Sequence, residues 1–432
     1  MEFKKVLGFW DIFWLGVGGM VGVAILTFPA ETYQMAGASS IIAWILAGVF
    51  SLFMAFIYAE MVTAFPTSGA LVRFPYEAFG KNRLSRYLAF LEGTGYYIGT
   101  VFGIVISAII LGEYIAPQLG SGIGQIAVAE AALLVVGIIN IFGVRITSRA
   151  NLAMSVVFMA LFAAVIVLAL LHGSISNLMP FVSGSGKWLG IANAIPIAIL
   201  AYGAWTVLIT IPEETTKVKE IPKAVLWSIV VVTIFYTLLV LGVYMNVSAK
   251  SLNSASDYYP VYQLVSLFNN PALLVVFEAG AVLSIVAVML VMVLSNARIL
   301  YALTRMDFLP KSMNRMSKNA IPVYATLLSF LIPMVLSIFP NQYYQYVVIG
   351  AIIGTGLPRI IDLLSYLKIR NAKAYRPAYR VRFGLLVAVI AFAGLVISEL
   401  SLGISDVTWS VLAFAILTGM FLLIDKRRRS IS

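Results

Sequence analysis

Four glycines fall within seven residues of an apolar stretch, at Gly16, Gly18, Gly19 and Gly22. Each glycine in a helix interior costs roughly 1 kcal/mol relative to alanine, so this cluster predicts a point where a membrane-spanning helix unwinds. Unwinding frees backbone N–H and C=O groups, and such backbone is tolerated at membrane depth only where it is buried in protein or lines a cavity. The pattern therefore indicates a site where backbone groups bind a substrate or an ion.

A second weak point lies in a later apolar segment, where a glycine stands between two aromatic residues and a proline precedes it. The residues concerned are Pro196, Ala201, Tyr202, Gly203, Ala204 and Trp205. Two discontinuous helices at matching places in two halves of a chain point to an inverted-repeat transporter with its site near the bilayer midplane.

Three carboxyl side chains lie within predicted membrane spans, at Glu60, Glu92 and Glu278. A charge at the bilayer centre costs at least roughly 3 kcal/mol, so a glutamate kept there is neutral, paired or functional. A buried carboxyl group that binds and releases a proton can couple transport to a proton gradient. These three residues are the candidates for proton coupling.

Composition defines the broad class. The 432 residues are 61% hydrophobic and 11% charged, against roughly 25% charged in soluble domains, which indicates a polytopic membrane protein. The net charge of +11 is interpreted as a topology signal rather than a nucleic-acid-binding surface. Cysteine is absent and His172 is the only histidine. We therefore expect no disulfide, no metal site and no cofactor, and the sequence contains no motif that predicts an enzyme.

Apolar runs of about 20 residues predict an all-α fold of twelve membrane spans. Their limits are 11–36, 38–64, 84–117, 124–143, 148–172, 189–212, 222–246, 271–304, 321–339, 343–361, 383–402 and 406–425. Lysine and arginine concentrate in the two tails and the even-numbered connections, where the cluster from Arg359 to Arg382 is counted, and only Lys187 and Lys250 fall in connections on the other side. This distribution predicts a multi-pass protein of the cell membrane with both termini in the cytoplasm.

Spacing between the two halves predicts an internal repeat. Gly203 lies 185 residues after Gly18, and Glu278 lies 186 residues after Glu92. The predicted organisation has two five-helix inverted repeats and two further helices. It divides the chain into a first repeat (1–172), an outer connection (173–188), a second repeat (189–361), a basic cytoplasmic loop (362–382), and helices 11 and 12 with a basic tail (383–432).

Several motifs resemble those of the amino acid, polyamine and organocation transporter superfamily. The glycine motif of the first span matches residues 18–25. Further similar stretches are 58–61, 64–70, 140–144, 213–215 with 221–224, and 297–305 with 309–310 and 321–324. The stretch 297–305 is the most specific of these, and the resemblance extends from residue 10 to about residue 380 in the expected order.

The resemblance implies a leucine-transporter-like fold with discontinuous helices 1 and 6, and it implies secondary transport of amino acids. It also implies that first-span backbone binds the substrate carboxylate, while carbonyls of both broken helices bind the amine. The corresponding residues here are Gly19, Val21, Gly22, Val23, Ala24, Ala201, Tyr202, Gly203 and Ala204, with Tyr96, Tyr97 and Trp205 as residues that line or gate the pocket. Many members of the superfamily have Gly-Ser-Gly where this chain has Gly22-Val23-Ala24. The expected carboxylate-binding site therefore lacks a hydroxyl group and a glycine.

The expected function is secondary active transport of neutral or apolar amino acids by alternating access, as proton-coupled symport or as exchange. Sodium coupling is disfavoured because no hydroxyl lies near residues 287–288, and Phe158 stands where proton-coupled relatives often carry a lysine. The expected partners are an amino acid, protons and the lipid bilayer, and the oligomeric state is left open. The alternatives are a polyamine or organic-cation transporter and an amino acid sensor of the same fold. A channel is a further class, but it needs a continuous polar-lined path, and polar residues within the spans are sparse.

Overall fold

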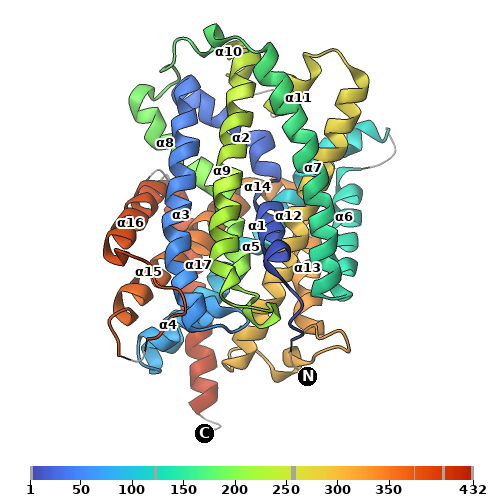
Figure 1. Cartoon of the computed structure of the whole chain (residues 1–432). Coiled ribbons are helices and arrows are strands. Elements are labelled where there is room, and N and C mark those ends of the chain that lie inside the picture. Colours follow the sequence, from blue (N-terminus) through green and yellow to red (C-terminus); the bar gives the residue numbers. More distant parts are fainter. Residues whose placement is uncertain (1–2, 121–123, 254–258, 374, 401–403, 430–432) are drawn as a thin grey trace.

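The computed structural model describes residues 3–120, 124–253, 259–373, 375–400 and 404–429. These residues form a bundle of α-helices joined by short turns and 3₁₀ segments, and no β-strand occurs among them (Figure 1). Seven segments of the described chain are long and apolar enough to cross a membrane: 23–64, 83–115, 144–172, 187–209, 220–246, 271–305 and 345–369. Three shorter apolar helices accompany them. The count of twelve spans and the inverted repeat stay predictions.

The helices of the first half are α1 (Phe9–Met20), α2 (Val23–Ala36), α3 (Ser40–Ala64), α4 (Ala70–Ala78), α5 (Arg83–Ile115), α6 (Gln125–Ile141) and α7 (Val144–His172). Those that follow are α8 (Lys187–Tyr202), α9 (Glu220–Asn246), α10 (Ala249–Leu252), α11 (Pro260–Ser266), α12 (Pro271–Arg305), α13 (Val323–Ser337), α14 (Tyr343–Ala351), α15 (Leu357–Ile369), α16 (Gly384–Leu400) and α17 (Ile404–Arg429). A 3₁₀ segment, η4 (Gly203–Ile209), continues α8, and a π-helical segment, η8 (Ile352–Gly356), joins α14 to α15.

The first apolar helix is interrupted where its glycines predict. α1 ends at Met20, the backbone of Val21 is extended, and α2 begins at Val23. Two glycines upstream of the break have a packing role: a Cβ on Gly16 would lie 2.6 Å from the hydroxyl of Ser228, and one on Gly18 would collide with two side chains of α7. The cluster therefore lets α1 pack closely against its neighbours and also allows the break that follows.

The second interruption takes a different form from a fully unwound segment. α8 ends at Tyr202 and the chain continues as the 3₁₀ segment η4, which keeps local hydrogen bonding. A 3₁₀ turn is tighter than an α turn and changes which carbonyls are bonded within the helix. Gly203 therefore marks a change of helix type and not an extended stretch.

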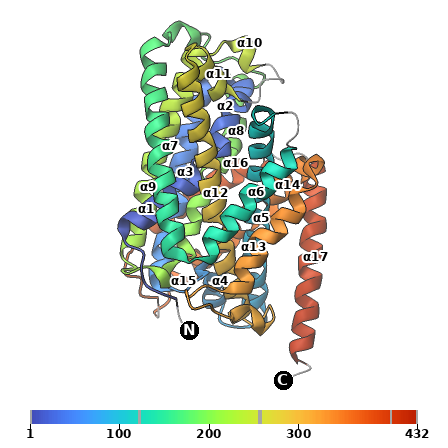
Figure 2. The ribbon, with the colours of Figure 1, turned by 90° about the vertical axis from the view of Figure 1, so that its right-hand side faces the viewer.

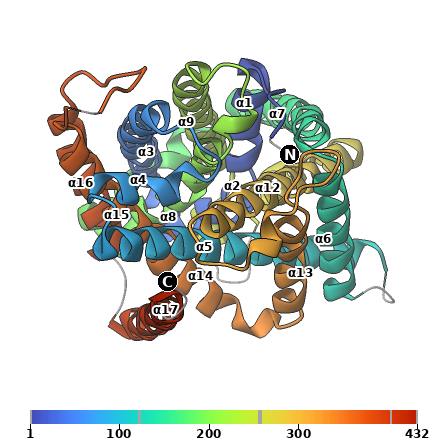
Figure 3. The same ribbon diagram turned by 90° about the horizontal axis from the view of Figure 1, so that it is seen from below.

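The interrupted helices pack against several neighbours: α1 contacts α7, α9, α12 and η4, and α2 contacts α8. α12 packs against α5 and α7, and α3 packs against α8 and α9. Seen from the end at which the chain starts, α12 and α5 run across the middle of the bundle, with α1 close by (Figure 3). The segment that enters α1 and the end of α17 lie at the same end of the bundle (Figure 1), and α17 stands on its flank (Figure 2). We call this end the terminus end.

Candidate functional site

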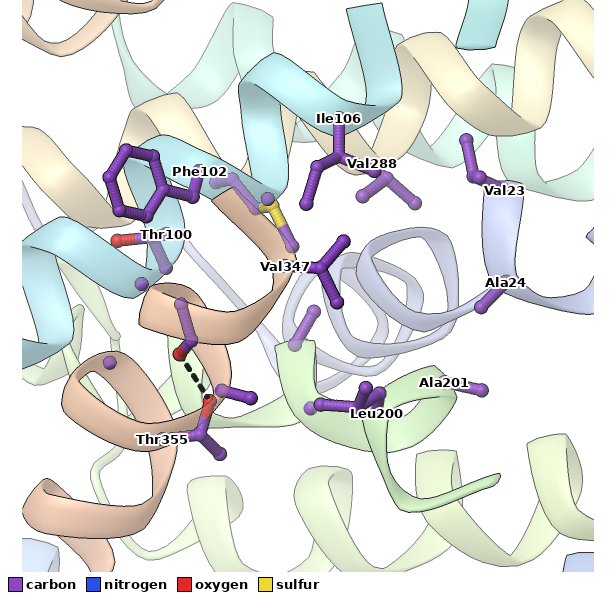
Figure 4. Close-up of a pocket in the computed structure, with 18 of the residues that line it drawn as sticks. Val23, Ala24, Thr100, Phe102, Ile106, Leu200, Ala201, Val288, Val347 and Thr355 are labelled. Atoms are coloured by element: carbon purple, nitrogen blue, oxygen red, sulfur yellow. Dashed lines mark hydrogen bonds between the residues drawn. The ribbon is translucent and has the colours of Figure 1, made fainter. Parts of the chain in front are cut away.

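A cavity of about 510 Å³ lies between the two interruptions. The first interruption contributes Gly19, Gly22, Val23 and Ala24 to its lining, and the second contributes Ala201, Gly203 and Ala204. α5, α12, α14, η8 and α15 complete the wall, and Figure 4 shows side chains of several of these elements around the space. The structure therefore brings together most of the backbone positions that the resemblance implied.

The side chains of this cavity are mainly apolar. Apolar groups of the lining shown in Figure 4 are Val23, Phe102, Ile106, Leu200, Val288 and Val347. Residues with hydroxyl groups in the lining are threonines, a serine and tyrosines, and the hydroxyl of Thr355 donates to the Gly350 carbonyl at 3.3 Å. A cavity with this lining suits a ligand that has a polar backbone-like part and an apolar side chain.

Two charged residues belong to the lining, and sequence reasoning placed neither there. Glu31 lies on α2 and is exposed, whereas Arg359 lies on α15 and is only 9% exposed. Residues 18–24 and 201–205 carry no charged side chain, but α15 brings Arg359 to the cavity from a distant part of the chain. Arg359 was not assigned to the site from the sequence, because it was counted among the basic residues that set the membrane topology.

Four of the predicted binding residues do not line this cavity. Val21 lies within the first interruption. Tyr97 points to α13, where its hydroxyl donates to the Leu328 carbonyl at 3.4 Å. Tyr202 is fully buried and donates to the Trp44 carbonyl at 3.1 Å. Trp205 is 1% exposed and packs edge-on against Tyr58, with ring centroids 5.2 Å apart. Tyr97, Tyr202 and Trp205 therefore contact neighbouring helices and contribute to helix packing in this structure.

Tyr96, the neighbour of Tyr97 on α5, does line the cavity. Its hydroxyl lies 3.1 Å from the hydroxyl of Thr206 on η4 and 3.1 Å from that of Ser295 on α12. Tyr96 lines the cavity and is buried. These two hydrogen bonds connect the second interruption to α5 and α12 beside the cavity.

One residue that the sequence did not single out connects both interruptions. The hydroxyl of Tyr236, on α9, lies 2.6 Å from the carbonyl of Met20 and 3.2 Å from that of Ala201. Both carbonyls belong to helix ends, where backbone acceptors lack partners within the helix. Tyr236 supplies that partner at a fully buried position. Its position inside a long apolar run of α9 gave no local sign of this role.

The three predicted proton-coupling residues have different environments. Glu60 is buried at the terminus end of α3, where it accepts a hydrogen bond from the Val381 N–H at 2.8 Å and lies 3.8 Å from the guanidinium of Arg370. Glu278 is half-buried near the start of α12. Glu92 is fully buried on α5, one turn before Tyr96, which lines the cavity. Of the three, only Glu92 lies near the cavity without a basic partner in the described structure.

Ion pairs and hydrogen bonds close the bundle between the cavity and the terminus end. Arg298 on α12 forms a bidentate pair with Glu214, with N–O distances of 2.5 and 3.0 Å, and both side chains are 1% exposed. The Glu214 carbonyl accepts the N–H groups of Val6 and Leu7. The Thr210 carbonyl, between η4 and this pair, accepts the N–H of Gly69 at 2.9 Å. The cavity is therefore closed toward the terminus end, and its remaining lining on α2 and α8 extends the other way.

These features define a multi-pass membrane transporter: an apolar helical bundle, a cavity at two interrupted helices, and closure on one side. Comparison with known proteins defines the family. The amino acid permease family matches residues 7–422, so the chain belongs to that family.

Individual relatives are distant. The chain is 22% identical over 455 aligned positions to the branched-chain amino acid permease BcaP of Lactococcus lactis subsp. cremoris, covering 99% of this chain and 96% of the relative. It is 25% identical to BcaP of Bacillus subtilis, covering 75% and 72%. It is 24% identical to cationic amino acid transporter 5 of Arabidopsis thaliana, covering 76% of this chain and 59% of the relative. The match thus spans less than two thirds of that plant protein.

Proposed function

We propose that this protein is a secondary active transporter that moves neutral, apolar amino acids across the cell membrane by alternating access. The observation that carries the proposal is the largely apolar cavity at the two helix interruptions, whose lining combines residues of both interruptions with aliphatic side chains of α5, α12 and α14. Transport is proton-coupled symport or exchange and does not require sodium.

The substrate carboxylate is assigned to the start of α2. The first N–H groups of a helix have no partner within it, and the helix dipole favours an anion there. Val23 and Ala24 are the first two residues of α2 and both line the cavity. The backbone can serve this purpose although Val23 and Ala24 replace the serine and glycine of many relatives.

The substrate amine is assigned to carbonyl groups near the second interruption. Ala201, Gly203 and Ala204 line the cavity there. The Ala201 carbonyl already accepts the hydroxyl of Tyr236, and a carbonyl oxygen has two lone pairs, so it can also accept a bond from an ammonium group. The carbonyls of η4 are the further acceptors that this arrangement provides.

The substrate side chain is assigned to the apolar wall made by Phe102, Ile106, Val288 and Val347. Burying one aliphatic side chain there contributes about 1.5–3 kcal/mol. Arg359 in the same lining disfavours a substrate with a second positive charge. The proposed substrate class is therefore that named for the branched-chain permeases among the relatives, and not that named for the cationic transporters.

Orientation follows from the distribution of basic residues, which assigns the terminus end to the cytoplasm. The described structure is then closed toward the cytoplasm by Arg298 and Glu214, and its cavity extends toward the outside. Alternating access requires this closure to open after the substrate binds. A polyamine or organic-cation carrier and a non-transporting sensor are the alternatives that the experiment must separate.

The test is uptake of labelled leucine into proteoliposomes under an inward proton gradient, an inward sodium gradient or neither, together with exchange against internal leucine. Valine and isoleucine are expected to compete, whereas arginine and spermidine are not. Gly22→Ala is the inactive control, because its added Cβ would collide with Val288. Gly419→Ala on α17, outside the cavity lining and with open space around its Cβ, is the matched control. Leucine binding without movement in any mode would indicate a sensor, and competition by spermidine alone would indicate a cation carrier.

A further inference from the structure

Two carboxyl groups from different helices meet inside the bundle. Glu92 on α5 and Asp362 on α15 are both 0% exposed, and the two helices pack against each other. The carboxyl groups are neighbours within side-chain hydrogen-bonding range. Within the described residues, none of their four oxygens has a well-formed hydrogen bond. Such a pair is unusual, because buried polar groups in native proteins are nearly always bonded.

The groups around this pair connect it to the cavity. Tyr58 on α3 faces Asp362, and Tyr96 lies one turn from Glu92 on α5. Arg359 lies one turn before Asp362 on α15, with its guanidinium in electrostatic range of both tyrosines. Tyr58, Tyr96 and Arg359 all line the cavity, whereas the two carboxyl groups do not. The pair therefore lies directly behind the cavity wall.

Electrostatics restricts the protonation states of two adjacent carboxyl groups. Like charges in direct contact at low dielectric repel strongly, so a buried carboxyl pair binds its protons as one coupled unit. One proton between the two groups gives an O–H donor for the other carboxylate and removes the repulsion. It would also satisfy oxygens that otherwise lack a partner.

We propose that Glu92 and Asp362 share one exchangeable proton and form the proton-coupling site of the transporter. This inference rests on the proposed function, and it names the coupling residues that the function requires. The proton exchanges with the cavity through the hydroxyl groups of Tyr58 and Tyr96. Glu60 is not assigned this role, because its Oε2 accepts the Val381 N–H and the Tyr366 hydroxyl, the Arg370 guanidinium lies 3.8 Å from its Oε1, and it does not line the cavity. Glu278 is half-buried and also lies outside the cavity lining.

The structure also offers a way for conformation to control this pair. α15 follows the π-helical segment η8, and such segments frequently occur at functional sites. Gly99 on α5 contacts Gly354 of η8 backbone to backbone, with no side chain between them. A shift of α15 along this smooth contact would separate Asp362 from Glu92. The two groups would then hold their negative charges apart, and the shared proton would leave.

The experiment measures two modes of transport in proteoliposomes. One mode is leucine accumulation driven by an inward proton gradient, with proton entry followed by an internal pH-sensitive dye. The other is leucine exchange at equal pH. The variants are Glu92→Gln and Asp362→Asn, and Glu113→Gln is the control with the same chemical change at an exposed position of the same helix, outside the cavity lining. We expect either variant of the pair to reduce accumulation and proton entry to the level without a gradient, while exchange continues and the control behaves as the parent.

A swap keeps the test decisive if a single variant folds poorly. Glu92→Asp with Asp362→Glu preserves both carboxyl groups and the total side-chain length, and it is expected to restore proton-driven accumulation. Infrared difference spectra of the parent provide an independent readout, since leucine binding should change a protonated-carboxyl band that Glu92→Gln abolishes.

The outcomes separate the two proposals. Proton-driven accumulation that persists in Glu92→Gln or Asp362→Asn would overturn the coupling site and leave the transport function standing. Exchange by the parent with no response to a proton gradient would also overturn the coupling site. A parent protein that moves no amino acid in either mode would instead contradict the proposed function.

Discussion

Removing Arg298 from its buried pair with Glu214 is expected to open the terminus end of the transporter. Both side chains are 1% exposed, and the pair joins α12 to the segment after η4. Arg298→Met keeps much of the side-chain volume but leaves the Glu214 carboxylate buried without its counter-charge. Opening this end would let water reach that carboxylate, so the substitution penalises the closed state more than the open state.

The magnitude follows from the burial of the pair. Removing one partner of a fully buried ion pair costs about 3–5 kcal/mol. At about 1.4 kcal/mol for each factor of ten, the equilibrium between closed and open states is expected to shift by two to nearly four orders of magnitude. The double variant Arg298→Met with Glu214→Leu removes the orphaned charge, and replacing a buried pair by apolar groups is often neutral, so it is expected to return toward the closed state.

The chain allows a clean assay because it contains no cysteine. Ser68→Cys places a single thiol at a buried position next to Gly69, which binds the Thr210 carbonyl, and the Ser68 hydroxyl has no hydrogen bond to lose. A membrane-impermeant maleimide is added from the terminus side of oriented vesicles. Labelling is expected to be slow with Arg298 present and much faster in Arg298→Met.

Equal labelling rates with and without Arg298 would refute this reasoning, because the pair would then not control access from that side. Faster labelling in the double variant than in Arg298→Met would refute it as well, since an orphaned charge would not be the cause of opening. Thermal denaturation of each variant provides the control for general unfolding.

Three further predictions concern the cavity and its supports. Gly18→Ala is expected to lose about 1–3 kcal/mol of stability, because its methyl group collides with side chains of α7. Gly19→Ala is the control, since its added Cβ would lie 3.2 Å from the nearest neighbour, and it is expected to melt near the parent temperature. Equal melting temperatures of the two variants would contradict the packing role of Gly18. Arg359→Gln should let arginine compete with labelled leucine in uptake assays, and continued exclusion of arginine would show that this guanidinium does not select against cations. Trp205→Ala is expected to destabilise the protein by about 3–5 kcal/mol, since the indole is buried against Tyr58, and a melting temperature unchanged by this substitution would argue for a role in ligand binding.

The sequence predicted the first interruption well because its cause is local. Glycines weaken a helix wherever they stand, so a cluster within one span indicates the break without any knowledge of neighbours. The sequence did not predict which glycines allow the break and which serve packing, because this depends on Ser228 and on side chains of α7 that approach Gly16 and Gly18 from distant segments. The second interruption was placed correctly at Gly203, but its 3₁₀ form depends on the surrounding packing.

The aromatic residues show where local reasoning fails. Tyr96 and Tyr97 are adjacent and chemically identical, yet only Tyr96 lines the cavity. Adjacent residues on a helix point about 100° apart, so one of them faces the cavity and the other faces α13. The sequence does not fix that rotation, since the polar and apolar side chains of α5 are not separated onto opposite faces of the helix. The same lack of separation hid Tyr236 on α9.

The charged residues of α15 were also assigned wrongly, but here the sequence contained enough information for the correct assignment. The predicted tenth span ended at residue 361, so Asp362 was counted in a cytoplasmic loop and Arg359 as a topology signal. The structure continues α15 to Ile369, and the apolar segment extends with it. An acid and a base three residues apart on a helix share one face, and the residues between and after them remain largely apolar. A solvated loop has no need for apolar residues, so the apolar residues that continue past Asp362 indicate that the helix continues as well. Two charged residues at this spacing within an apolar helix are therefore better explained as buried functional groups than as the end of a membrane span.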